Sequence, residues 1–188
     1  MILEEEELNE IYFIESGHVA AFKDEEKIVD FFAKEDVLGL ANLLLDSKSE
    51  YSFQVISNEL IVTKYEKSDI IEKVINTQEG YFYHYVHMQN QVERMIEKEA
   101  LLRLPSEQRI SLALFQIVTK FGESTGKQHI SRFPKQISKG MIAQYTSMNP
   151  NTITNVIQKL EEEEIIHPLR RTIHVDMSKL EMKLKEML

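Results

Sequence analysis

The sequence contains no cysteine, and this absence excludes several classes of chemistry. Disulfide bonds, thiolate catalysis, zinc-finger ligation and iron–sulfur clusters held by cysteines are all ruled out. The chain also lacks any apolar run near the ~20 residues that a membrane span requires. Its first ten residues, MILEEEELNE, have neither the basic nor the apolar region of a secretory signal. We therefore expect a cytoplasmic protein that does not contact a membrane.

Basic charge is scarce in the front part of this 188-residue chain, which is long enough for one large or two small domains. Residues 1–75 carry 18 acidic and 7 basic side chains, whereas residues 76–188 carry 13 acidic and 15 basic ones. Because nucleic acids attract positive charge, we expect any DNA contact in the back part. The basic excess there is small, so we expect two copies of the chain to act together.

Residues 137–160, ISKGMIAQYTSMNPNTITNVIQKL, have the pattern of two short helices joined by a tight turn. Ser138 is a candidate cap for the first helix, and Asn149 followed by Pro150 is typical of the start of a second one. Apolar residues recur there at spacings of three and four, which leaves a polar face directed outward. The pattern indicates a helix-turn-helix, although a small helical hairpin with a solvated polar face would share it.

The segment after these helices favours DNA binding over the plain hairpin. Residues 165–175 alternate β-forming side chains around two arginines, which predicts a β-hairpin wing whose tip contacts phosphates, although a solvated loop remains the alternative. Hydrogen-bonding side chains on the second helix are suited to reading base edges. The candidate DNA-binding residues are Ser138, Lys139, Asn149, Asn151, Thr152, Thr154, Asn155, Gln158, Lys159, Arg170 and Arg171.

A long helix is predicted over residues 77–104, and it carries a heptad seam interrupted by Glu99. Another copy of the same helix would satisfy this seam most directly, so we expect a parallel homodimer. The alternative is a helix packed on its own β-rich domain, with Phe82, Val86 and Ile96 as the contacting side. The predicted dimer residues are Tyr81, Tyr85, Met88, Val92, Met95 and Leu102.

Short β-like runs separated by turn residues fill residues 11–68 and predict an antiparallel barrel or sandwich. With the long helix and the helix-turn-helix, this order resembles the Crp/Fnr family of bacterial transcription regulators. The resemblance rests on Ile11–Val19, on Val37-Leu38-Gly39 and on residues 142–160. It implies an α+β protein with a jelly-roll, cyclic-nucleotide-binding-like barrel (1–76, shortened at its start), a dimerisation helix (77–104) and a winged helix-turn-helix domain (105–188).

The chain departs from the family pattern where ligands would bind. Members that bind cyclic nucleotides carry a Gly-Glu pair and an arginine, but here Gly39 is followed by Leu40, and Glu50 stands in the region of the arginine. A carboxylate near a cyclic phosphate would repel it, so we expect no cyclic AMP binding. His18 is a weak candidate for a haem ligand, and we expect no cofactor. The resemblance implies a near-palindromic DNA site, and RNA polymerase is a further candidate partner.

In the recognition helix, many relatives have glutamate and arginine where this chain has Pro150, Asn151, Thr152 and Asn155. Asparagine pairs best with adenine, so a preference for A·T pairs is expected. Residues 122–127 fail the P-loop spacing and are interpreted as a flexible linker. His84 and His87 are interpreted as surface histidines and not as a metal site. No catalytic grouping is found, so an enzyme is not expected; the competing hypothesis is an effector- or protein-binding module whose winged helix is a docking surface.

Overall fold

The computed structural model describes residues 7, 9–43, 48–169 and 172–187. The chain divides into two compact units, Met1–Lys98 and Glu99–Leu188, and each is described by itself. Among the described helices, none is both long enough and apolar enough to cross a membrane.

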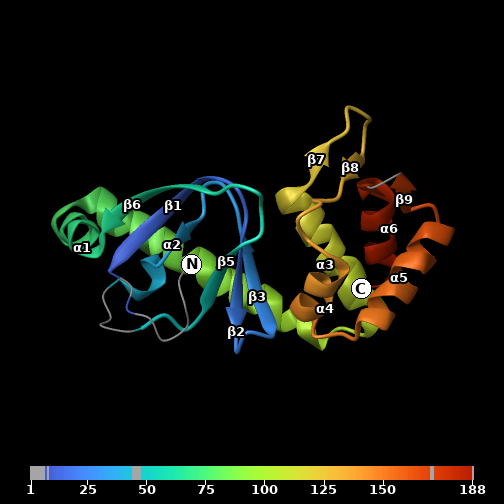
Figure 1. Cartoon of the computed structure of the whole chain (residues 1–188), viewed down its shortest axis with the longest axis horizontal. Helices are drawn as coiled ribbons and strands as arrows, with labels where there is room; N and C mark the ends of the chain where they lie inside the picture. Colours follow the sequence, from blue (N-terminus) through green and yellow to red (C-terminus); the bar gives the residue numbers. More distant parts are fainter. Residues whose placement is uncertain (1–6, 8, 44–47, 170–171, 188) are drawn as a thin grey trace. The chain divides into compact units, whose positions relative to one another are not determined.

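The N-terminal unit is rich in short antiparallel strands (Figure 1). They form two three-stranded sheets, ordered β4-β1-β6 and β3-β2-β5. Gly17 makes the turn after the first strand at φ 100°, where a Cβ would collide with the carbonyl of Glu59. The strands are β1 (Glu10–Ser16), β2 (Val19–Lys23), β3 (Lys27–Phe32), β4 (Val37–Leu38), β5 (Ser52–Val55) and β6 (Ile61–Glu66).

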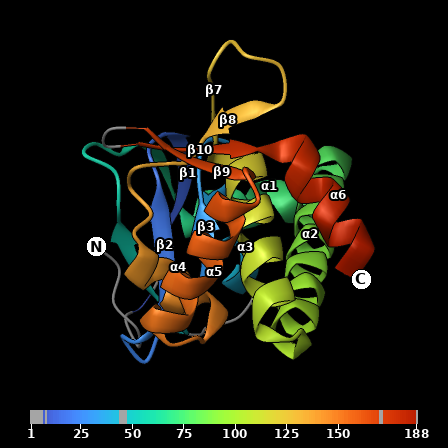
Figure 2. The same ribbon diagram turned by 90° about the vertical axis from the view of Figure 1, so that its right-hand side faces the viewer.

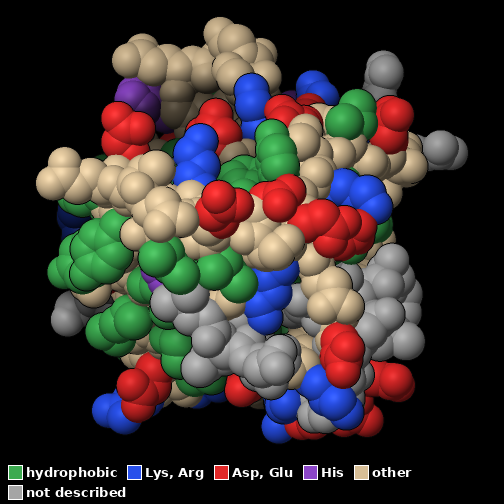
Figure 3. Space-filling view, turned by 90° about the vertical axis from the view of Figure 1, so that its left-hand side faces the viewer, with side chains coloured by type: hydrophobic (Ala, Val, Ile, Leu, Met, Phe, Trp, Pro, Cys, Tyr) green, Lys and Arg blue, Asp and Glu red, His purple; other side chains and the backbone are tan. Residues whose placement is uncertain are grey.

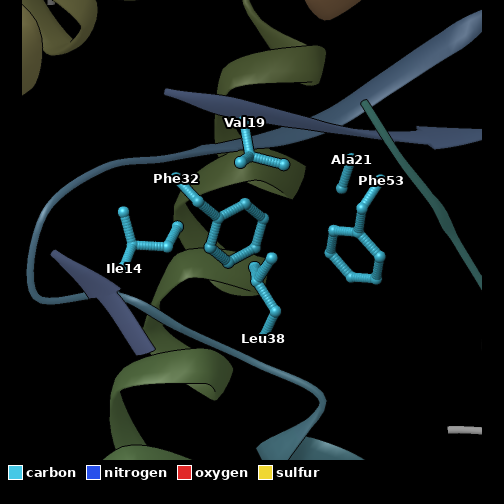
Figure 4. Packing of buried hydrophobic residues seen from close by; sticks show 6 residues of the cluster. All are labelled: Ile14, Val19, Ala21, Phe32, Leu38 and Phe53. Atoms are coloured by element: carbon cyan, nitrogen blue, oxygen red, sulfur yellow. The ribbon is translucent and has the colours of Figure 1, made fainter. Parts of the chain in front are cut away.

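One hydrophobic core joins the two sheets. Its buried side chains come from five strands and converge in Figure 4: Ile14, Val19, Ala21, Phe32, Leu38 and Phe53. The Phe32 and Phe53 rings meet edge to face with centroids 5.9 Å apart, a favourable aromatic geometry. The expected β-rich domain is therefore present, with its interior filled by its own side chains. The described strands form open sheets, so the closed jelly-roll barrel stays a prediction.

Three helical segments complete this unit: η1 (Leu40–Asn42), α1 (Lys67–Asn76) and α2 (Gln78–Arg103), the last continuing into the second unit. A second apolar cluster packs α1 against the strands through Val74, Ile11 and Leu40. Strand geometry explains the two clusters, because alternate residues of β1 point to opposite faces of the sheet.

Polar side chains on α2 contact the β-rich part of the unit. Arg94 pairs with Asp36 at 2.5 Å and with Asp30 at 3.4 Å, and Lys98 donates a hydrogen bond to the carbonyl of Ile28. The proposed contact through Phe82, Val86 and Ile96 is wrong, because Phe82 is 67% exposed and Ile96 60%. Arg94 and Lys98 therefore lie on the face of α2 that contacts the strands.

His84 and His87 lie on this inward side and are half-buried, not surface residues. Burial first, and then the electrostatic influence of the neighbouring His84 and Arg94 side chains, lower the pKa of His87 to about 4. Within the described ranges, no group of three or more histidine, aspartate or glutamate side chains could hold a metal ion.

In its described part, the C-terminal unit contains the end of α2, helices α3 to α6 and a four-stranded sheet ordered β7-β8-β10-β9, which lies on one side of α3, α4 and α5 (Figure 2). The predicted flexible linker over 122–127 is wrong, because strand β7 lies within it and pairs with β8 as a hairpin. An ion pair of 2.9 Å between Arg132 and Glu123 supports this pairing. The elements are α3 (Ser106–Phe121), β7 (Glu123–Ser124), β8 (Ile130–Arg132), α4 (Lys139–Thr146), α5 (Pro150–Glu162), β9 (Ile166–Leu169), β10 (Thr172–Asp176) and α6 (Met177–Met187).

Candidate nucleic-acid interface

Helix α4 begins where the sequence places its cap. The Ser138 hydroxyl accepts a hydrogen bond of 3.2 Å from the amide of Met141, which satisfies one of the free donors at the helix start. Ile142, Ala143 and Tyr145 are buried and hold the helix on the core of the unit. Ser138 and Lys139 are exposed at this end, where their donor groups are accessible to a phosphate.

Hydrogen bonds to α4 and from α3 hold the turn between α4 and α5. Ser147 adopts a left-handed conformation with φ 52°, and the amide of Met148 donates back to the carbonyl of Ala143 at 2.9 Å. Thr146 is fully buried, and its hydroxyl donates to the carbonyl of Ile142 at 2.7 Å. The Arg109 guanidinium, from α3, donates to the carbonyl of Thr146 at 3.2 Å. These contacts fix the angle at which α5 leaves α4.

Helix α5 has a buried apolar face and, opposite it, a polar face. The Asn149 side chain accepts from the amide of Asn151 at 2.8 Å, and Pro150 occupies the first turn as predicted. Ile153, Val156, Ile157 and Leu160 are buried. Of the predicted DNA-binding residues on this helix, those exposed are Asn151, Asn155, Gln158 and Lys159, and those half-buried are Thr152 and Thr154.

Two of these side chains have intramolecular partners. The Thr154 hydroxyl donates to the carbonyl of Pro150 at 3.1 Å, which leaves it only as an acceptor. The Lys159 ammonium lies 2.7 Å from a carboxylate oxygen of Glu107, whose pKa is lowered by this hydrogen bond and by a second one from Lys183. Lys159 therefore fastens α5 to α3, and its charge is already partly neutralised.

Strands β9 and β10 form the hairpin expected after α5. Thr172 pairs with Leu169 and Val175 with Ile166, so the strands close around the segment that carries Arg170 and Arg171. These two arginines lie outside the described residues. Strand β10 also pairs with β8, on the side opposite β9, and the sequence did not predict this pairing.

The candidate dimer surface is the outward stripe of α2. Its exposed members are Tyr81 (65%), Tyr85 (52%), Val92 (46%) and Met95 (66%). Met88 and Leu102 are half-buried. Large apolar side chains grouped on one helix face are costly to leave in water, which makes this stripe a candidate contact surface.

Residues that sequence reasoning missed are Arg109 and Glu107, which support the turn and α5 respectively. Arg109 contacts Thr146, which lies 37 residues further along the chain, and no local pattern indicates a contact of that range.

Comparison with known proteins shows a shared fold without close sequence similarity. No protein-family model matches the chain, and no curated protein matches it. The structure is similar to FixK2 from Bradyrhizobium japonicum, with a TM-score of 0.82 and 15% identity over 97% of this chain and 90% of that one. It is similar to a transcriptional regulator of the CRP family from Thermus thermophilus, with a TM-score of 0.78 and 19% identity over 98% and 92% of the two chains.

A transcriptional regulator of the Crp/Fnr family from Eubacterium rectale also matches, with a TM-score of 0.68 and 12% identity over 98% of this chain and 88% of that one. The chain therefore has the fold of Crp/Fnr transcription regulators, as the sequence resemblance implied. At these identities the comparisons establish the fold, and function is inferred from the site.

Proposed function

We propose that this chain is a Crp/Fnr-type transcription regulator that binds DNA sequence-specifically as a homodimer. The observation that carries the proposal is the exposed, hydrogen-bonding face of α5, which is held in place by a capped and buried turn beside a β-hairpin. Because polar side chains on a fixed helix are suited to base edges in a major groove, α5 is the reading element of a winged helix-turn-helix.

In this proposal two kinds of contact have separate tasks. Asn151 and Asn155 read base edges, with adenine as the preferred partner of an asparagine amide. Ser138 and Lys139, together with the wing arginines, bind phosphates and set the register of α5 on the duplex. Lys159 contributes less than its exposure indicates, because its ammonium is paired with Glu107.

The outward stripe of α2 pairs two copies of the chain as a parallel coiled coil. Two α5 helices then enter successive major grooves of a near-palindromic site, with half-sites ~34 Å apart. Pairing also compensates for the modest positive charge of each C-terminal unit, because both copies contribute phosphate contacts to one complex.

Substitutions in α5 and α4 test this division of tasks. Asn155→Ala should reduce the discrimination between a selected site and a scrambled duplex by ~1–3 kcal/mol. Lys139→Ala should weaken binding to both duplexes equally and lower the salt slope by about 1. Fluorescence anisotropy at several salt concentrations measures both quantities, and Lys185→Ala on α6 is the matched control. Equal loss on both duplexes with Asn155→Ala would contradict base reading.

A further inference from the structure

A pocket of about 580 Å³ opens on the N-terminal unit between α1, the start of α2 and strands β1 and β6. Phe13 and Leu40 line it, and both belong to the apolar cluster that packs against α1. The neighbouring Ile14 points to the other face of β1, into the filled core between the sheets. The pocket is therefore separate from the filled core between the two sheets.

The walls of the pocket are largely apolar and aromatic. The Phe13 and Tyr65 rings meet edge to face with centroids 5.5 Å apart, and Tyr83 from α2 adds a third ring. Tyr65 is 46% exposed and Tyr83 51%, so both rings present surface to an incoming molecule. In Figure 3, which faces the side where α1 lies, hydrophobic side chains gather in one region with both acidic and basic side chains beside it. The volume is in the range of small-molecule sites.

The charge around the pocket is negative. Among the described residues that line it, Glu15, Asp69 and Glu79 are acidic and Lys73 is basic. Glu15 accepts a hydrogen bond from the hydroxyl of Thr63 at 3.0 Å. In the part of the chain that the structure describes, Asp69 and Glu79 have no ion-pair partner. Carboxylates and the faces of aromatic rings both attract cations, and together they disfavour an anionic ligand.

The corner between α1 and α2 gives the pocket a defined back wall. Gly80 packs so closely on the end of α1 that a Cβ would collide with the carbonyl of Lys73. The side chain of Thr77 fixes the same corner, because its hydroxyl donates to the carbonyl of Lys73 and accepts from the amide of Gly80. A molecule in the pocket would contact both helices at the point where α2 begins.

We propose that this pocket binds an organic cation with an apolar, aromatic body. The rings and the aliphatic residues of α1 bury the body, and the carboxylates of Asp69 and Glu79 face the charge. The proposal does not rest on DNA binding, since it concerns only the N-terminal unit and is measured by ligand binding itself. The proposed site lies on the outside of the β-rich domain, and not in the core between the two sheets, which side chains fill.

The 188-residue chain can be tested with two probes of nearly the same shape and opposite charge. Tetraphenylphosphonium should bind in isothermal titration calorimetry with one site per chain, whereas tetraphenylborate should bind at least about tenfold more weakly, because only the charge differs. Binding of the cation should weaken as salt rises. Equal or tighter binding of tetraphenylborate would overturn the proposal.

Variants locate the binding site. Replacing both Asp69→Asn and Glu79→Gln keeps the side-chain size and should weaken the cation about tenfold, and Tyr83→Ala should do the same by removing a wall. Glu72→Gln, an exposed α1 residue outside the lining, should leave affinity unchanged. Met95→Ala, in the exposed stripe of α2, should also leave it unchanged. If Met95→Ala abolishes binding and Tyr83→Ala does not, the probe occupies the stripe and the proposal fails.

Discussion

Arg109 supports two turns of the C-terminal unit with one guanidinium group. It donates to the carbonyl of Leu104 at 2.9 and 3.1 Å, at the start of the unit, and to the carbonyl of Thr146 in the turn before α5. Hydrogen bonds from a charged donor to partly buried carbonyls are stronger than neutral ones. The orientation of α5 therefore depends on a side chain that does not itself belong to the proposed DNA surface.

Removing this side chain should destabilise the unit. Arg109→Met leaves partly buried carbonyls without a donor, so the free energy of unfolding should fall by ~1–3 kcal/mol in urea denaturation. Arg103→Met is the control, because Arg103 is exposed and its ion pair is with Glu99, one turn earlier in the same helix. That control should change stability by less than ~0.5 kcal/mol. If both substitutions lower the free energy of unfolding equally, the Arg109 contacts make no specific contribution to stability.

Lys98 is a second residue of interest, because its burial should make the stability of the protein depend on pH. Burial lowers its pKa to about 7, although Asp30 acts in the opposite direction. The unfolded chain has the ordinary lysine pKa near ~10.4, so between about pH 7 and 10 the unfolded state binds more protons than the folded state. The contribution of Lys98 to stability should therefore rise with pH across this window and be constant below it.

Lys98→Met removes this titration. The variant should be more stable than the original protein at about pH 7, and the difference should shrink as the pH rises toward about 10. Urea denaturation at several pH values measures it. Lys27→Met, which replaces an exposed lysine at the start of β3, should leave the pH profile unchanged. A constant difference between Lys98→Met and the original protein across this range would contradict the burial of the ammonium.

At the scale of the element, α2 has its polar side inward and a large part of its apolar side outward. Arg94 and Lys98 contact the β-rich part of the N-terminal unit, whereas Tyr81, Tyr85 and Met95 are exposed. A helix of a monomeric protein usually has the opposite arrangement. This inversion is the physical argument for a second copy of the chain on α2.

A charge placed on the stripe should prevent that association. Val92→Glu would bury a carboxylate between two helices, so the dissociation constant of the dimer should rise by at least about a hundredfold. Asn90→Glu adds the same charge on a different face of α2 and should leave the dimer intact. Sedimentation equilibrium at micromolar concentration distinguishes the two, and an unchanged mass for Val92→Glu would exclude the stripe as the interface.

Elements whose signals are local were predictable from the sequence. The caps at Ser138 and Asn149 and the proline at position 150 mark α4 and α5 correctly, because each acts within one helical turn. The hairpin of β7 and β8 was missed, since its pairing depends on β10, which pairs with β8 from a distant part of the sequence. The inward face of α2 was missed as well, because ion pairs with Asp30 and Asp36 cannot be inferred from helical spacing.

At the scale of the whole molecule, charge is divided between the units. Residues 1–98 are strongly acidic, whereas residues 99–188 carry 10 acidic and 13 basic side chains. A single C-terminal unit with this small excess should bind DNA weakly and lose affinity steeply as salt rises. Under the proposed function, sequence-specific binding at physiological salt would therefore require both the polar face of α5 and the pairing of two copies through α2.

The most direct test is selection of binding sites by the purified protein from random duplex DNA at two salt concentrations. We predict an enriched near-palindrome with A·T-rich half-sites whose centres are about one helical turn apart, retained less well at the higher salt. Enrichment of a single, unpaired half-site would contradict the dimer. No enrichment at either salt would contradict sequence-specific binding and favour the winged helix as a protein-docking surface.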